Sequence, residues 1–165
     1  MWLVHGGPGV GKSETIKLVQ SLFTDVLHWN SGINYQIAAL QAVMAEQLGG
    51  DTLHHSCGIC IGKFKSEGAH SQGTKRQHEV AKAVLQWRWL IIDEISMISS
   101  QLLAEIDTSL RNIDRSNGSE RLSAAGDVRL FGVINVPFVS DFWQLDRPRG
   151  RECTWESWMR CGHSQ

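Results

Sequence analysis

The sequence predicts an α/β fold in which a parallel β-sheet is flanked by helices. Short apolar segments alternate along the chain with segments of helical periodicity, as expected for parallel strands, whose connections need a crossover that is usually a helix. A glycine-rich stretch, residues 6–13, separates the first strand from the first helix. Further along, the apolar run "WLII" ends directly in two acidic residues, Asp93 and Glu94.

In the first half of the chain we expect two strands, each followed by a helix. The four segments are a strand at 2–5, a helix from Gly11, a strand at 35–40 and a short helix at 41–48. In the first helix, Ile16, Val19 and Phe23 recur on one face, which is the spacing of a helix that packs against a sheet. The second helix is expected to end before Gly49 and Gly50, because glycine suits the residue after a helix.

In the second half of the chain we expect two more helices and two more strands. In order, they are a loop at 62–76, a helix that presents Val80, Ala83, Val84 and Trp87, a strand at 89–93, a helix capped by Ser99 or Ser100, a loop at 114–128 and a strand at 129–141. The second of these helices is expected to bury Leu102, Leu103, Ile106, Leu110 and Ile113. Pro137 interrupts the last strand, where proline would remove a ladder hydrogen bond. No strand or helix is expected after residue 145.

Length and charge limit the classes of function. A chain of 165 residues can form one domain with a real core. Its 16 basic and 17 acidic residues create no net positive field, so any contact with nucleic acid is expected to be local. The longest apolar runs are far shorter than the roughly 20 residues of a membrane span, and no signal peptide is recognisable. We therefore expect an intracellular protein without a membrane partner.

The four cysteines are expected to be reduced thiols, as is usual inside cells. A zinc site is the alternative for "HHSCGIC", which supplies His54, His55, Cys57 and Cys60. Structural zinc sites usually combine two ligand pairs at standard spacing, and the second pair is absent here. The reduced-thiol interpretation is therefore favoured.

The segment "GGPGVGKS" matches G-x-x-x-x-G-K-[ST] and has the strand before it and the helix after it that this phosphate-binding motif requires. Glycines let backbone N–H groups turn toward phosphates, Lys12 would reach the β- and γ-phosphates, and the Ser13 hydroxyl would bind Mg²⁺. We expect ATP as the ligand. The predicted contacts are Gly6, Gly7, Pro8, Gly9, Val10, Gly11, Lys12, Ser13 and Glu14.

Two further segments could complete this site. Asp93 ends an apolar strand, where open α/β sheets bind ligands, and would hold the magnesium ion. Glu94 could orient or deprotonate a water for attack on the γ-phosphate, which favours hydrolysis over binding alone. In "SDFWQLD", Asp141 and Gln144 end another apolar strand, and Gln144 could donate a hydrogen bond to the γ-phosphate.

Taken together, these segments resemble the Pif-type, RecD-like branch of superfamily 1 DNA helicases. "GGPGVGKS", "WLIIDEISMISSQLLAEID" and "FVSDFWQLD" look like the first three motifs of that family. "LQAVMAEQLGGDTLHH" is similar to the segment that touches single-stranded DNA. The resemblance covers residues 2–145. It implies a P-loop NTPase domain with a RecA-like sheet, placed at 1–145 and followed by a divergent tail at 146–165.

The resemblance also implies roles for individual residues. Lys12 corresponds to the phosphate lysine, Ser13 and Asp93 to magnesium ligands, Glu94 to the catalytic base and Gln144 to the γ-phosphate sensor. The implied contacts with single-stranded DNA are Thr52, His54 and His55. Ser140 is a departure from the family pattern, because it stands where the third motif usually has glycine.

The resemblance therefore predicts an ATP-dependent DNA helicase that is present here as an incomplete motor. The upstream glutamine segment that reads adenine and the second ATPase domain, with its arginine finger, are expected to be missing from these residues. The alternative is a nucleotide-binding remnant without enzymatic activity, and a small-molecule kinase is a third interpretation that "DFWQLD" and "GGDTLHH" disfavour. The family's roles would be DNA repair, recombination and telomere maintenance in a nucleus or mitochondrion.

Overall fold

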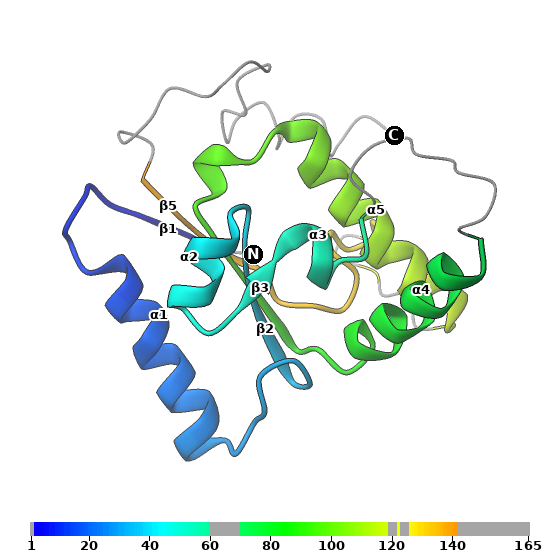
Figure 1. The fold of residues 1–165 in the computed structure, drawn as a ribbon, viewed down its shortest axis with the longest axis horizontal. Helices are drawn as coiled ribbons and strands as arrows, with labels where there is room; N and C mark the ends of the chain where they lie inside the picture. The colour runs from blue at the N-terminus through cyan, green and yellow to red at the C-terminus, as the bar shows by residue number, and fades with distance from the viewer. Residues whose placement is uncertain (1, 60–69, 119–121, 123–125, 142–165) are drawn as a thin grey trace.

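A five-stranded parallel sheet forms the centre of the molecule (Figure 1). The protein is represented by a computed structural model that describes residues 2–59, 70–118, 122 and 126–141. The strands, in chain order, are β1 (Trp2–His5), β2 (Tyr35–Ala39), β3 (Asp51–Thr52), β4 (Trp89–Asp93) and β5 (Pro137–Ser140). Their order across the sheet is β1-β5-β4-β2-β3, so β5 lies between β1 and β4. The predicted fold class is confirmed.

Helices connect these strands. They are α1 (Lys12–Ser21), a π-helical turn at Leu22–Val26, α2 (Ala42–Gln47), α3 (Leu53–Ser56), α4 (His70–Val84), a 3₁₀ turn at Ile95–Met97, and α5 (Ser100–Ser116). The side chain of Ser99 accepts a hydrogen bond from the Leu102 N–H, so Ser99 is the cap of α5. Figure 1 shows α1 on one side of the sheet and α4 and α5 on the other.

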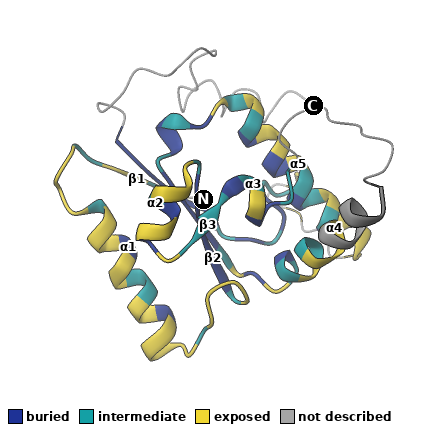
Figure 2. Cartoon of the chain, in the orientation of Figure 1, coloured by how far each residue is buried: buried dark blue, intermediate teal, exposed yellow. Residues whose placement is uncertain are grey.

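Each face of the sheet has its own apolar core, because successive side chains of a strand point to opposite faces. On β4, Leu90 and Ile92 belong to the core under α5, whereas Ile91 belongs to the core under α1. The α5 core contains Leu103, Ile106 and Leu110, and the α1 core contains Ile16, Phe23 and Val139. Burial on both faces explains why β4 is a continuous apolar run, and Figure 2 shows the central strands buried.

The parallel register brings the carboxyl ends of the strands to one edge of the sheet. His5 at the end of β1 pairs with Ser140 at the end of β5, and Asp93 at the end of β4 pairs with Ala39 of β2. Ala39 also pairs with Thr52 of β3. Every segment that carries a predicted site residue in the described part of the chain therefore starts from this edge.

Two predicted loops are partly wrong. The loop predicted at 62–76 is wrong from residue 70 onward, because α4 begins at His70. Residues 62–69 lie outside the described ones. Forming the first hydrogen-bonded turn is the costly step of helix formation. Burial of the helix end near Val84 stabilises such a turn, so the helix can extend into the polar sequence. The loop predicted at 114–128 is wrong at its start, because α5 continues to Ser116 and buries Asp114 in its last turn.

The strand predicted at 129–141 is also wrong in extent, since β5 comprises only Pro137–Ser140. Carboxylates of α5 hold the preceding residues in turns: the Phe131 N–H donates to Asp107 Oδ1 and the Val133 N–H donates to Asp114 Oδ2, each at 2.7 Å. Pro137 is the first residue of the strand rather than an interruption of it. At the start of a strand the missing N–H is tolerated.

Gly50 allows a close approach that no other residue could make. It precedes β3, and a Cβ atom at this position would collide with the main-chain carbonyl of Ile37 in the buried strand β2. Main-chain atoms of a central strand cannot move aside cheaply, so the requirement for glycine is steric.

We predict that Gly50→Ala lowers the free energy of unfolding by about 1–3 kcal/mol through overpacking. Gly7→Ala is the matched control, because nothing lies within 4 Å of the Cβ it would add, and its effect should stay within about 0.5 kcal/mol. Urea denaturation followed by circular dichroism measures both. An equal effect of the two substitutions would contradict the steric argument.

Candidate nucleotide-binding site

The glycine-rich segment forms a loop between the end of β1 and the start of α1. Gly9 and Gly11 have φ angles of 75° and 89°, a left-handed conformation that glycine adopts without strain. Gly11 is the N-cap of α1 and has no side chain that could bond the first N–H groups of the helix. The N-terminus of α1 is therefore free to bind an anion through its backbone.

The Lys12 side chain lies across this loop. Its Nζ donates hydrogen bonds to the carbonyls of Gly6 at 2.8 Å and Gly7 at 2.9 Å, and it lies 3.6 Å from Asp141 Oδ2. The Asp141 side chain is fully buried. Lys12 therefore has its positive charge at the point where the loop meets the end of β5. Ser13 and Glu14 are exposed in the first turn of α1, where Glu14 pairs with Lys17.

Asp93 and Glu94 follow the buried strand β4. Burial raises the pKa of the Asp93 carboxyl above its ordinary value, and a backbone hydrogen bond at Glu94 and the charge of Lys12 partly offset this effect. Burial also raises the pKa of Glu94, as do the neighbouring charges of Asp93 and Asp141, whereas Lys12 and a hydrogen bond with Ser96 lower it. Three carboxyl groups thus lie near the positive charge of Lys12. When they are ionised, their negative charge exceeds that of the lysine, which favours binding of a further cation.

Glu94 has an unusual backbone conformation. Its φ of 54° and ψ of 47° lie in the left-handed region, which costs a residue with a Cβ about 1 kcal/mol or more. The 3₁₀ turn at Ile95–Met97 follows directly, and Met97 N–H donates to the Glu94 carbonyl at 3.0 Å. The turn directs the chain away from the sheet immediately after the two carboxylates.

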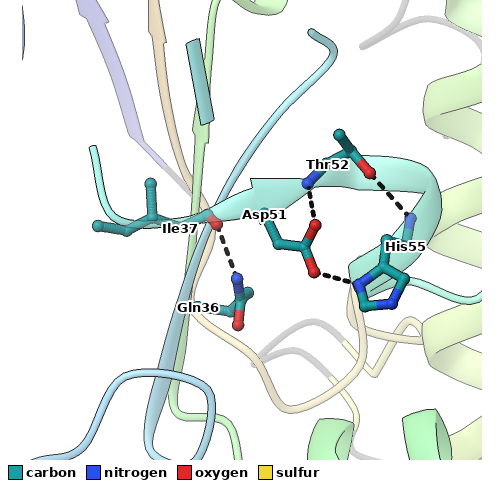
Figure 3. A network of polar contacts seen from close by, with 5 residues as sticks. All are labelled: Gln36, Ile37, Asp51, Thr52 and His55. Carbon is teal, nitrogen blue, oxygen red and sulfur yellow. Dashed lines mark hydrogen bonds and ion pairs between the residues drawn. The ribbon is translucent and has the colours of Figure 1, made fainter. Parts of the chain in front are cut away.

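The predicted DNA contacts lie at the same edge of the sheet, around β3 and α3 (Figure 3). Thr52 Oγ1 accepts a hydrogen bond from the His55 N–H at 3.3 Å, so this hydroxyl caps α3. The Asp51 carboxylate bonds the Thr52 N–H at 2.7 Å and pairs with Nδ1 of His55. His55 is exposed and His54 is half-buried. Thr52 therefore has a structural role that the sequence prediction did not include.

Gln144 lies outside the described residues, as does the tail at 146–165. Its strand is described, and β5 lies between β1 and β4, the strands that precede the two other motifs. Sequence reasoning missed the contact between Lys12 and Asp141, because 129 residues separate them and only the β1–β5 register brings them together. The sole signal for this contact in the sequence was Asp141, a polar residue at the end of an apolar strand.

The zinc alternative is not supported by the described ligands. Cys57 is a free, buried cysteine, and burial raises the pKa of its thiol to about 12. Within the described ranges, no group of three or more His, Cys, Asp and Glu residues is placed to hold a metal ion. Cys60 lies outside those ranges.

These features define a class of protein. A parallel sheet whose first strand leads through a glycine loop into a helix, with acidic residues at the end of a nearby strand, is a P-loop NTPase fold of the RecA-like type. The chain belongs to the PIF1-like helicase family, because the model of that family matches residues 1–149.

Comparisons with individual relatives agree with this family assignment. The chain is 31% identical over 143 residues to the ATP-dependent DNA helicase PIF1 of Candida albicans, covering 85% of this chain and 14% of that protein. It matches the crystal structure of the Candida albicans Pif1 helicase with a TM-score of 0.63 and 27% identity, over 90% of this chain and 30% of that one. It matches Bacteroides Pif1 in complex with ADP-AlF3 and ssDNA with a TM-score of 0.60 and 26% identity, over 94% and 32%.

The chain thus spans about a seventh of the Candida albicans helicase and about a third of the solved helicase structures. Among the described residues, no helix has the length and apolar character needed to cross a membrane.

We predict that Lys12→Ala abolishes binding of Mg²⁺-ATP, because it removes the cation expected at the β- and γ-phosphates. Lys17→Ala is the matched control on the same helix, since Lys17 pairs with the exposed Glu14. Equilibrium titration with a fluorescent ATP analogue measures both, with circular dichroism as a check of folding. Equal affinity of the Lys12 variant and the parent chain would remove Lys12 from the site.

Proposed function

We propose that residues 1–165 form the nucleotide-binding half of an ATP-dependent DNA helicase motor. The observation that carries this proposal is the convergence of Lys12, Asp93, Glu94 and Asp141 beside the uncapped N-terminus of α1. Lys12 and the loop N–H groups suit a phosphate chain. The neighbouring carboxylates suit the divalent ion that accompanies it. The ssDNA and ADP-AlF3 of the Bacteroides structure support the same ligands for this chain.

In this proposal the loop N–H groups bind the phosphates, and Lys12 exchanges the carbonyls of Gly6 and Gly7 for phosphate oxygens. Ser13 and Asp93 hold Mg²⁺, which would neutralise charge on the β- and γ-phosphates. The donor set fits this ion, because magnesium is usually bound by one or two protein oxygens together with substrate phosphates and waters. Gln144 is proposed as a donor to the γ-phosphate.

Glu94 is the proposed general base, whose carboxylate would orient the attacking water and accept its proton. The raised pKa of Glu94 makes the carboxylate a stronger base than an exposed one, while the nearby charge of Lys12 favours the ionised form. The left-handed backbone of Glu94 sets the direction of this side chain relative to Asp93. Strain at a position with a directional task is typical of functional sites.

Thr52, His54 and His55 are the proposed contacts with single-stranded DNA. They lie at the same edge of the sheet as the nucleotide site, because Ala39 pairs with both Thr52 and Asp93. We further propose that the whole protein works in DNA repair, recombination or telomere maintenance in a nucleus or mitochondrion. Fluorescence microscopy of the tagged protein tests this location, and exclusion from both compartments would contradict it.

We predict that binding to single-stranded DNA depends only weakly on salt. Few phosphates should be neutralised by this chain, whose net charge is −1. Each neutralised phosphate contributes about 0.7 to the slope of log affinity against log salt. The measurement is fluorescence anisotropy of a labelled oligothymidine over a salt series. A slope typical of six or more phosphates would reveal a basic surface elsewhere.

The location of this contact can be tested separately. His54→Ala is expected to weaken oligothymidine binding, whereas His78→Ala on the exposed part of α4 is expected to leave it unchanged. Equal affinities of these two variants would contradict the proposed interface.

We also predict that the isolated chain binds ATP but hydrolyses it far more slowly than about 1 s⁻¹, which lies at the low end of ordinary enzymes. An arginine finger is worth about 10³ to 10⁵ in rate. Three arginines have other partners: Arg111 pairs with Asp107 at 2.6 Å, Arg129 donates to Asn135 Oδ1 at 2.9 Å, and Arg88 lies over the Trp29 ring. Arg115 lies near the end of α5.

The measurement is DNA-stimulated phosphate release by residues 1–165, with Glu94→Gln as the blank. Fast turnover that Glu94→Gln abolishes would mean that the chain is self-sufficient. ATP binding without any hydrolysis above this blank would favour the non-enzymatic remnant.

A further inference from the structure

A buried side-chain hydrogen bond connects β5 to the turn that follows β4. Ser140 Oγ accepts from the Ser96 N–H at 3.0 Å, although 44 residues separate the two. Ser140 is 0% exposed and Ser96 is 9% exposed. A buried backbone N–H that loses its acceptor costs about 1–3 kcal/mol, so this contact constrains the turn strongly.

Ser96 lies two residues after Glu94, within the 3₁₀ turn. It also forms a hydrogen bond with the Glu94 side chain. The N–H of Ser96 is thus fixed by β5, and Ser96 in turn contacts the carboxylate. Because the left-handed conformation of Glu94 is costly, it needs such a constraint to persist.

Ser140 is itself held firmly. Its neighbour Val139 packs in the core under α1, and Asp141 is paired with Lys12. The Ser140 carbonyl accepts a hydrogen bond from the N–H of Gly6, the first glycine of the phosphate loop, at 3.3 Å. One residue thus contacts the phosphate loop through its backbone and the acidic turn through its hydroxyl.

We propose that Ser140 is a positioning residue for hydrolysis, which holds the Glu94 carboxylate at the attacking water by fixing Ser96. This inference rests on the proposed function, because Glu94 needs to be the general base. Because Ser140 is 0% exposed, its hydroxyl is expected to affect the rate of the chemical step and not the affinity for ATP. A displacement of about 1 Å in a reacting group can cost up to 10²-fold in rate.

The test is single-turnover hydrolysis of radiolabelled Mg²⁺-ATP by residues 1–165 in excess, followed over hours. Ser140→Ala is expected to slow hydrolysis by at least about tenfold and to leave the dissociation constant for ATP unchanged. Ser140→Thr, which keeps the hydroxyl, is expected to retain the rate. Ser109→Ala removes a hydroxyl of α5 that donates to the Cys57 carbonyl at 3.5 Å, and it controls for a general loss of stability.

Two readouts separate positioning from a merely structural role. In the Glu94→Gln background, Ser140→Ala should cause no further slowing, because Ser140 acts through Glu94. Deuterium exchange of the Ser96 amide should accelerate in Ser140→Ala and not in Ser109→Ala. If Ser140→Ala does not fold, Ser140→Cys, which has nearly the same size and only a weak acceptor, takes its place.

An unchanged rate in Ser140→Ala overturns this inference, as does equal slowing in the presence and absence of Glu94 or an unchanged Ser96 exchange rate. A parent chain that binds ATP but hydrolyses it no faster than Glu94→Gln also overturns it, because Glu94 then has no water to activate. A parent chain that does not bind ATP overturns the proposed function itself. Binding measurements therefore distinguish the two failures.

Discussion

The position of β5 between β1 and β4 is the constraint on which the candidate site depends. The register aligns His5 with Ser140 and Ile92 with Phe138, so three strands that are distant in sequence end side by side. Main-chain hydrogen bonds fix this alignment, and an apolar core on each face keeps the strands in place. A shift of one residue along β5 would turn Val139 toward the wrong core and separate Asp141 from Lys12.

The site that results is electrostatically expensive. Asp93 and Asp141 are 4% and 0% exposed, and both share Lys12 with Glu94. Burial of several carboxyl groups disfavours their ionised forms, which is why the pKa values of Asp93 and Glu94 are raised. The left-handed backbone of Glu94 adds to this cost. The two cores stabilise the fold enough to tolerate a site that is arranged for a phosphate and a cation rather than for stability.

Local sequence signals were sufficient where one physical cause dominates. The glycines around Lys12 predict a loop of unusual backbone conformation, and the four apolar residues before Asp93 predict a buried strand; the structure contains both. The prediction failed at 129–136, where apolar residues are held in turns by carboxylates of α5. No periodicity could reveal this, because Asp107 and Asp114 belong to a different element and act on backbone N–H groups rather than on side chains.

The sequence by itself determined β1, β2 and β4, the phosphate loop and the identity of the chemical groups, since these depend on residues that are neighbours along the chain. Only the tertiary structure decided which groups share a charge: that Lys12 faces Asp141, and that Ser140 rather than a nearby residue accepts the Ser96 N–H. Those contacts cross 129 and 44 residues. They arise from strand order and register, which are set by the packing of the whole sheet and are not encoded in any single segment.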